Sequence, residues 1–273
     1  MAHGVHQARL VSHGPSHRAS ESSGMLTSWD GAGFHVAAER RGVGGTGGGD
    51  FYTLAVRAPG HIGVVIGDTC GRGSDGEAQL SLILPKIHEL ALSGAPPAAL
   101  LGELNRIVGA TLPTDRFVTA AAFELDMRQG MLTVANAAHV PALLRARKGS
   151  DVAIVGQASG TPLGLWEDTL YVDEHSELYE GDLIVLMTDG VLEALEPDLV
   201  AMSTLKRLLD ETMVAPDASR PSGSNRARTV HEALLRKFDD CTAGGRPDDM
   251  TLMVLQAIFE PIGSSFLDFA RAG

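Results

Sequence analysis

Hydrophobic positions along the chain either alternate with polar ones or form short apolar runs, and most of these segments predict β-strands. Alternation with a period of two, or an apolar run of about four to eight residues closed by glycine or a turn residue, is typical of strands. A turn signal at 126–130 predicts that the strands on either side of it form a hairpin. The predicted strands are 34–39, 51–57, 62–66, 117–125, 131–136, 142–147, 152–155, 170–175, 183–187 and 250–256.

Apolar residues spaced three and four apart predict helices elsewhere in the chain. Pro85 should bend or split the first helix, and Pro96 with Pro97 begins the second. The predicted strands are joined mainly as antiparallel hairpins and do not alternate with helices. The pattern therefore predicts an α+β fold in which helices cover sheets, and not a βαβ fold. The predicted helices are 75–93, 96–110, 191–195, 199–213 and 228–238.

Both ends of the chain and one internal stretch lack this regular pattern. Residues 1–30 are rich in His, Ser and Gly, so we expect a flexible tail there rather than a metal site at its scattered histidines. Residues 31–259 are predicted to form one domain. Within it, 197–247 is a flank of helical patches around a Pro/Ser/Gly-rich loop at 216–225. Residues 260–273 are predicted as a C-terminal tail.

Composition narrows the possible partners and environment. With 273 residues and 44% hydrophobic content, the chain can build a sizeable core. A net charge of −12 and a pI of about 5.2 argue against nucleic acid or an anionic membrane as the main partner. No apolar run approaches the ~20 residues of a membrane span, and the N-terminus lacks the apolar core of a secretion signal. Two cysteines, Cys70 and Cys241, form no disulfide framework, so we expect a cytoplasmic protein of unspecified oligomeric state.

Five aspartates lie where glycine meets a predicted buried strand. The apolar run 62–66, for example, leads to Asp68 on a glycine-rich turn at 67–73. One such aspartate alone is as compatible with an ordinary turn as with a ligand. Several converging at one sheet edge would repel one another unless a cation neutralised them. We therefore predict a Mg²⁺ or Mn²⁺ site, either catalytic with one or two metals or structural. The aspartates are Asp50, Asp68, Asp189, Asp248 and Asp249.

Two other kinds of site are not supported. The glycine-rich run 42–50 lacks the Gly-Lys-Ser/Thr ending of a phosphate-binding loop and leads into a strand instead of a helix. The histidines outside the tail have no zinc-ligand spacing and are expected to be structural.

Seven motifs, taken in order, resemble the PPM-type (protein phosphatase 2C-like) metal-dependent serine/threonine phosphatases. The resemblance is strongest to the bacterial branch of the sporulation stage II protein E and sigma-factor regulator phosphatases. Each motif is weak alone, but their order is specific and they extend from about 34 to 256. The resemblance implies a four-layer αββα sandwich of two mainly antiparallel sheets, with a metal centre at one end. The motifs are 48–52 (GGDFY), 66–73 (IGDTCGRG), 117–126 (FVTAAAFELD), 135–141 (ANAAHVP), 160–165 (GTPLGL), 178–194 (LYEGDLIVLMTDGVLEA) and 247–255 (PDDMTLMVL).

The resemblance also implies roles for the aspartates. Asp68 matches the aspartate that bridges two divalent cations, and the backbone carbonyl of Thr69 matches a further ligand. Asp189 and Asp248 match the ligands of the second cation. Together with Asp68 they are the predicted catalytic residues.

Two further acidic positions match the family less directly. Asp50 corresponds to the acid that holds metal-bound water. Asp249 is a second choice to Asp248 as ligand.

Three positions depart from the branch pattern. Thr53 stands where a second acid is usual and should weaken the support of the metal ligands. Arg72 replaces a histidine, and Ala138 replaces the glycine before the motif histidine. Arg72 could bind substrate phosphate or face solvent, and Arg41 is an alternative, with Arg40 beside it.

The implied function is hydrolysis of phosphoserine or phosphothreonine by in-line attack of metal-activated water, without a phosphoenzyme. The implied substrate is a phosphorylated anti-anti-sigma-type protein, and the domain at 31–259 would be the PPM-type phosphatase domain. One alternative is a non-catalytic module that keeps the fold and binds a partner. Another is a phosphohydrolase acting on small molecules.

Overall fold

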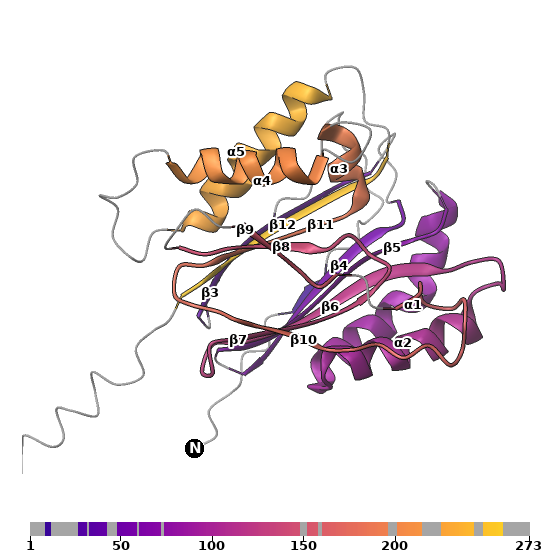
Figure 1. The fold of residues 1–273 in the computed structure, drawn as a ribbon. Coiled ribbons are helices and arrows are strands. Elements are labelled where there is room, and N and C mark those ends of the chain that lie inside the picture. The colour runs from indigo at the N-terminus through magenta and orange to yellow at the C-terminus, as the bar shows by residue number, and fades with distance from the viewer. Residues whose placement is uncertain are drawn as a thin grey trace, which may run out of the picture.

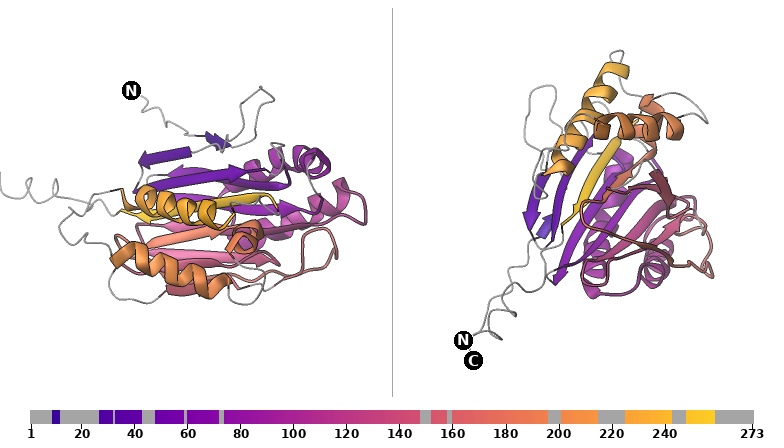
Figure 2. Two further views of the ribbon diagram at one scale, coloured as in Figure 1. Left: turned by 90° about the horizontal axis from the view of Figure 1, so that it is seen from above. Right: turned by 60° about the vertical axis from the view of Figure 1, so that its left-hand side comes forward.

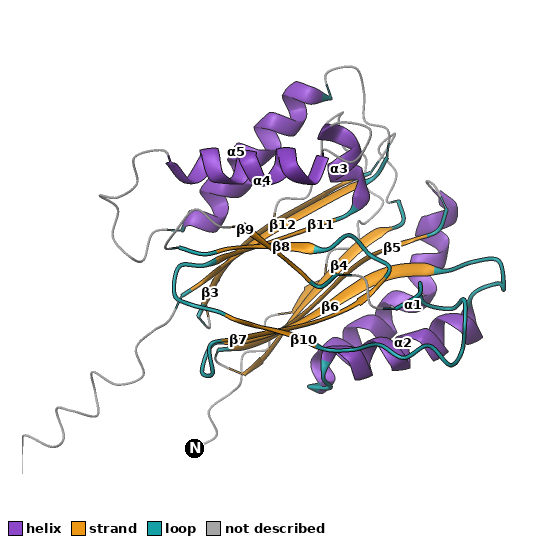
Figure 3. Cartoon of the chain, viewed as in Figure 1, coloured by secondary structure: helices purple, strands orange, loops and turns teal. Residues whose placement is uncertain are grey.

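The computed structural model describes residues 9–11, 27–31, 33–42, 48–58, 60–71, 74–147, 152–157, 160–195, 201–214, 225–242 and 248–258. Two six-stranded sheets face each other, and helices cover their two outer faces (Figure 1). Figure 3 shows the same layers by type of secondary structure. This is the predicted αββα arrangement.

The first sheet has the strand order β1-β4-β5-β6-β7-β10, and every neighbouring pair is antiparallel. Its strands are β1 (Arg9–Val11), β4 (Asp50–Ala58), β5 (His61–Thr69), β6 (Val118–Asp126), β7 (Met131–Ala137) and β10 (Glu174–Glu177).

The second sheet has the order β2-β3-β12-β11-β8-β9 and is also antiparallel throughout. Its strands are β2 (Thr27–Gly31), β3 (Phe34–Arg41), β12 (Met250–Ala257), β11 (Leu183–Met187), β8 (Ala142–Arg145) and β9 (Val152–Val155).

Helices cover each sheet on the side away from the other sheet (Figure 2). The first sheet is covered by α1 (Ser74–Ser93) and α2 (Pro97–Thr111). The second is covered by α3 (Asp189–Leu195), α4 (Ala201–Val214) and α5 (Arg226–Cys241). Among the described residues, no helix has both the length and the apolar character that crossing a membrane requires.

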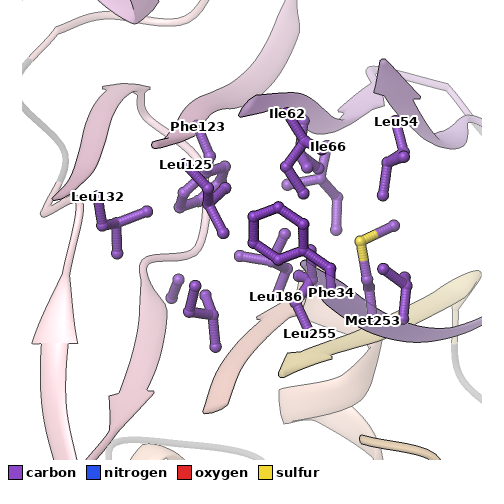
Figure 4. Close-up of a cluster of buried hydrophobic side chains, with 14 of the residues drawn as sticks. Phe34, Leu54, Ile62, Ile66, Phe123, Leu125, Leu132, Leu186, Met253 and Leu255 are labelled. Atoms are coloured by element: carbon purple, nitrogen blue, oxygen red, sulfur yellow. The ribbon is translucent and has the colours of Figure 1, made fainter. Parts of the chain in front are cut away.

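Alternation along the strands divides the apolar side chains among three cores. One core lies between the sheets, where Phe34 and Met253 of the second sheet meet Ile66 and Phe123 of the first (Figure 4). The other two lie between each sheet and its own helices. Full burial of one such side chain contributes about 1.5–3 kcal/mol. These cores hold the two sheets at a defined separation. The polar residues described next lie at one end of the core between the sheets.

Two predicted elements differ in the structure. Pro85 does not split α1, because Ile83, Leu84 and Ile87 on both sides of it are buried against the first sheet and offset the lost hydrogen bond. The strand predicted at 170–175 begins only at Glu174.

The segment before Glu174 lies over α2 instead of in a sheet. Asp173 Oδ1 accepts a hydrogen bond from the Ala98 backbone N–H at 2.8 Å, at the start of that helix. Leu170 is 85% exposed, so its apolar side chain has no core to join. The alternation in this segment therefore does not reflect a sheet.

The predicted tail at 1–30 contains two short strands, β1 and β2, which pair with β4 and β3. Residues 260–273 and nearly all of the loop at 216–225 lie outside the described residues. The domain limits at 31 and 259 therefore stay predictions.

Candidate metal centre

At one end of the sandwich, the inner face of the first sheet changes from apolar to polar. Asp50 of β4 lies directly opposite Asp68 of β5, and Asp68 lies opposite Thr119 of β6. The preceding inward positions, such as Tyr52 and Ile66, belong to the core between the sheets. Directly opposed side chains have Cβ atoms about 4.5–5.5 Å apart. Strand register alone therefore brings two carboxylates and a hydroxyl into one row.

A third carboxylate comes from the second sheet. Asp189 is the first residue of α3, which begins just after β11. One carboxylate oxygen from each of Asp50, Asp68 and Asp189 lies within 4.8 Å of the others. Hard divalent cations take oxygen ligands at about 2.0–2.6 Å, so these three groups can share a cation. We call Asp50, Asp68 and Asp189 the acidic cluster.

Asp50 joins the two sheets at this point. Its Oδ2 accepts a hydrogen bond from the Thr188 hydroxyl at 2.6 Å and another from the Thr251 hydroxyl at 2.8 Å. The Thr188 hydroxyl also accepts the Thr251 backbone N–H at 2.8 Å. Arg40 donates from Nη1 to the backbone carbonyl of Asp50 at 2.5 Å. Asp50 is thus held on the second sheet by three side chains, although its strand belongs to the first.

The cluster is electrostatically unfavourable without a cation. Burial raises the pKa of Asp50 to about 7, although its two hydroxyl donors act in the opposite direction. Burial, followed by the charges of Asp50 and Asp189, raises the pKa of Asp68 to about 8. The pKa of Asp189 is also raised, first by burial and then by the charge of Asp248. Asp50 is buried, Asp68 half-buried and Asp189 exposed, and carboxylates that repel one another in such a partly buried site are the donor set that a divalent cation stabilises.

Asp248 and Asp249 occupy different positions. Asp249 is buried, and its Oδ2 accepts the Gly49 backbone N–H at 3.0 Å, so it holds the loop before β4. Asp248 is half-buried and lies outside the group of three, and the charges of Asp248 and Asp249 both raise the pKa of Asp68 and of Asp189. The choice of Asp248 over Asp249 as a further ligand therefore stays a prediction.

The glycines at 48 and 49 allow the backbone to pass against these carboxylates. A Cβ at Gly49 would lie 2.6 Å from Asp68 Oδ1 and 2.7 Å from the Thr69 carbonyl oxygen. A Cβ at Gly48 would lie 1.9 Å from Asp249 Oδ2. The Thr69 backbone N–H donates to the Gly49 carbonyl at 3.2 Å. The end of the glycine run therefore packs on the acidic cluster.

Of the arginines considered in the sequence, Arg40 reaches the acidic cluster and Arg41 does not. Arg41 pairs with Glu39 on its own strand and with Asp239 of α5 at 2.5 Å, on the outer side of the second sheet. Arg72 lies outside the described residues. Arg40, the neighbour of Arg41, is the one that reaches the cluster.

The departure at Thr53 does not affect the acidic cluster directly. Its side chain points toward the helices and shares a hydrogen bond of 3.0 Å with His88 Nδ1 of α1. The support for Asp50 comes from the second sheet instead, through Thr188 and Thr251, which the sequence analysis missed. The strand pattern could have indicated both. Each threonine occupies the next inward-facing position of its strand after the apolar inward-facing residues end.

A family model described as stage II sporulation protein E (SpoIIE) matches residues 58–258, well over half of the chain. The chain belongs to this family. The predicted resemblance is therefore confirmed, and the match includes Asp68, Asp189 and Asp248.

Individual relatives agree with the family. The chain is 29% identical over 209 residues to the phosphoserine phosphatase RsbU of Bacillus subtilis (strain 168), covering 76% of this chain and 59% of the relative. The chain thus spans less than two thirds of the length of that relative.

Solved structures show the same fold. The RsbU and RsbW domains of Rv1364c from Mycobacterium tuberculosis align with a TM-score of 0.67 at 23% identity, over 84% of this chain and 61% of theirs. The PP2C phosphatase domain of SpoIIE from Bacillus subtilis, with a fragment of its regulatory domain, aligns with a TM-score of 0.66 at 18% identity. That alignment covers 85% of this chain and 64% of the SpoIIE chain. The predicted αββα sandwich is confirmed.

Proposed function

We propose that this chain is a metal-dependent protein serine/threonine phosphatase. The observation that carries the proposal is the acidic cluster, in which both sheets bring carboxylate oxygens within 4.8 Å of one another. Family membership supports it, since the relative RsbU is a phosphoserine phosphatase. Asp189 is exposed, so a phosphorylated segment can approach the acidic cluster from that side, an access that a structural cation site would not require.

The residues have separable roles in this proposal. A carboxylate oxygen of Asp68 lies within 4.8 Å of oxygens of both Asp50 and Asp189, so in this proposal Asp68 would contact two cations, with the Thr69 carbonyl, Asp189 and Asp248 completing their ligands. When bound, Mg²⁺ or Mn²⁺ would lower the pKa of water and neutralise charge on the phosphoryl oxygens.

Asp50 has a different role, because its Oδ2 is already engaged by two threonine hydroxyls. Neither of those bonds uses Oδ1, which can accept a hydrogen bond from the attacking water. In the reaction, the water oxygen bonds to phosphorus while the bond from phosphorus to the serine or threonine oxygen breaks. The products are inorganic phosphate and the free hydroxyl side chain.

The substrate we propose is a phosphorylated regulatory protein of the anti-anti-sigma type. The motif order of the sigma-factor regulator branch supports this assignment. A phosphoprotein fits an open site better than an enclosed one, because the phosphorylated residue projects from a folded surface.

The test is hydrolysis of a chromogenic aryl phosphate with Mn²⁺, with Mg²⁺ and with a chelator, by the wild type and by Asp189→Ala. We expect activity that requires a metal and falls by at least about 10³-fold in the variant, since a lost ligand removes cation and charge neutralisation together. A folded wild type without activity with either metal would instead support the partner-binding module. Comparing a phosphoserine protein with small phosphate esters then separates a protein phosphatase from a small-molecule phosphohydrolase.

A further inference from the structure

Thr119 and His139 form a threonine–histidine hydrogen bond at the acidic cluster, and two similar pairs lie elsewhere in the described part of the chain. Thr119 Oγ1 and His139 Nδ1 are 3.1 Å apart. The second such pair, Thr133 with His175, is exposed on β7 and β10 at the same distance. The third joins Thr53 to α1. Only the Thr119 pair includes a residue directly opposite Asp68.

The backbone around His139 is held unusually firmly. The Asn136 side chain accepts the His139 N–H at 2.7 Å and donates to the His139 carbonyl at 3.0 Å. The same amide donates to the Gly156 carbonyl at 2.6 Å. Ala138 has a φ of 56°, in the left-handed region that costs an alanine about 1–2 kcal/mol. Strain that the surrounding contacts maintain is typical of functional sites.

The direction of the hydrogen bond follows from the surroundings of the ring. His139 is 5% exposed, and burial lowers its pKa to about 4, so the imidazole is neutral and carries one hydrogen. The backbone of Met187 is the other polar group that acts on the ring. Its effect is to raise the pKa, as a carbonyl oxygen near a ring N–H does, although Nε2 makes no full hydrogen bond. Because Nδ1 is the nitrogen next to Thr119, we assign the hydrogen to Nε2. Nδ1 is then an acceptor, and the Thr119 hydroxyl must donate to it.

A hydroxyl whose hydrogen is committed to histidine can only accept from any further partner. Phosphoryl oxygens are acceptors too, so Thr119 cannot bind them; a water can donate to it. Building on the phosphatase function proposed above, we propose that Thr119 accepts a hydrogen bond from the attacking water. In this proposal His139 is a positioning residue that fixes the direction of the Thr119 hydroxyl. Thr119 on one side and Asp50 on the other would then turn a lone pair of the water toward phosphorus.

The kinetic test compares Thr119→Val, Thr119→Ser and the matched control Thr133→Val, which breaks the same kind of bond away from the cluster. With aryl phosphate at saturating Mn²⁺, we expect Thr119→Val to lower kcat by about 10- to 100-fold. Its KM, and its Mn²⁺ affinity measured by calorimetry, should change less than about threefold, because no ligand is removed. Thr119→Ser should keep kcat within about threefold of the wild type, and Thr133→Val should leave it unchanged. A Thr119→Val enzyme with normal kcat, or a serine variant as impaired as the valine variant, would overturn the proposal.

A second test needs no metal and no activity. In the metal-free protein, ¹⁵N NMR of the histidine rings should show His139 with hydrogen on Nε2 and a bare Nδ1. Thr119→Val should shift the Nδ1 resonance of His139 and leave His175 unchanged. Hydrogen on Nδ1 of His139 would overturn the proposal even in an active enzyme. An inactive wild type with the expected His139 spectrum would instead refute the phosphatase function and, with it, the role of Thr119, while leaving the Thr119–His139 bond established.

Discussion

The two ends of the β5–β6 strand pair place polar groups on the same sheet in opposite settings. At one end, Glu124 accepts a hydrogen bond from His61 Nε2 at 2.5 Å and lies 3.6 Å from Arg57 Nη1. At the other end, Asp68 faces Asp50 and Asp189, and none of the ion pairs among the described residues involves these three.

The carboxylate at the first end supports the fold, whereas the carboxylates at the other end are arranged to bind a ligand. Glu124 has its partners within the protein, as most buried charges must. The acidic cluster has hydroxyl donors for Asp50, whereas the charges that act on Asp68 are all those of other acids, and the pKa values of both residues are raised. The predictions below test whether the two ends differ in this way.

The largest effect is expected when the two ends receive the same substitution. Asp68→Asn should lower metal-dependent hydrolysis by at least about 10³-fold, because a neutral amide is a poor ligand for two cations. Asp126→Asn at the opposite end should leave the rate unchanged, since asparagine can still accept the turn N–H groups that Asp126 Oδ1 accepts now. Equal loss in both variants would contradict a special role for the cluster.

Stability of the metal-free protein should fall as pH rises from about 6.5 to 8.5. Asp50 and Asp68 titrate near 7 and 8 in the folded state and near 4 when unfolded. In this range the folded state therefore binds more protons than the unfolded state. Ionising Asp50 and Asp68 as pH rises lowers the free energy of unfolding. Below this range, the lowered pKa values of buried His139 and His231 destabilise the fold as pH falls.

Saturating Mg²⁺ should remove the decline above pH 6.5, because the cation binds the ionised carboxylates and only the folded state holds them together. Urea unfolding at several pH values, with chelator and with Mg²⁺, measures both curves. A metal-free protein that becomes more stable between pH 6.5 and 8.5 would show that the cluster is not strained by its charges.

Two glycines should respond in opposite directions to alanine. At Gly49 the new Cβ would lie 2.6 Å from Asp68 Oδ1, so Gly49→Ala should destabilise the protein by about 1–3 kcal/mol and lower activity. At Gly102 in α2 no atom lies within 4 Å of the new Cβ, so Gly102→Ala should stabilise it by about 0.5–1 kcal/mol. Chemical denaturation measures both, and a tolerated Gly49→Ala would disprove the close approach.

The smallest effect is expected at Ala138. Glycine there removes left-handed strain of about 1–2 kcal/mol but adds about 0.4–1 kcal/mol of unfolded-state entropy. Ala138→Gly should therefore raise the free energy of unfolding by between about 0 and 1.5 kcal/mol. A clear loss of stability would mean that the φ of 56° carries no strain.

Much of the fold was predictable because its signals are local. Runs such as 62–66 and 183–187 are short, apolar and bounded by glycine and aspartate turn residues, and this combination favours strands. The strand predicted at 170–175 was largely wrong, because alternation alone does not show whether a neighbouring strand is there to pair with. At Pro85 the lost helical hydrogen bond was correctly expected, but burial of the neighbouring side chains against the first sheet outweighed that loss.

The sequence by itself determined which residue types carry the chemistry: aspartates at the ends of apolar strands, with glycines beside them, in the motif order of one family. The tertiary structure alone decided which side chains face each other. Strand register placed Thr119 opposite Asp68, and the packing of the two sheets brought Thr188 and Thr251 to Asp50. It also turned Arg41 away and Arg40 inward, although the two are neighbours in the chain. The physical reason is that pleating and sheet packing are long-range: they depend on segments that lie 200 or more residues apart in the sequence, as Gly49 and Asp249 do.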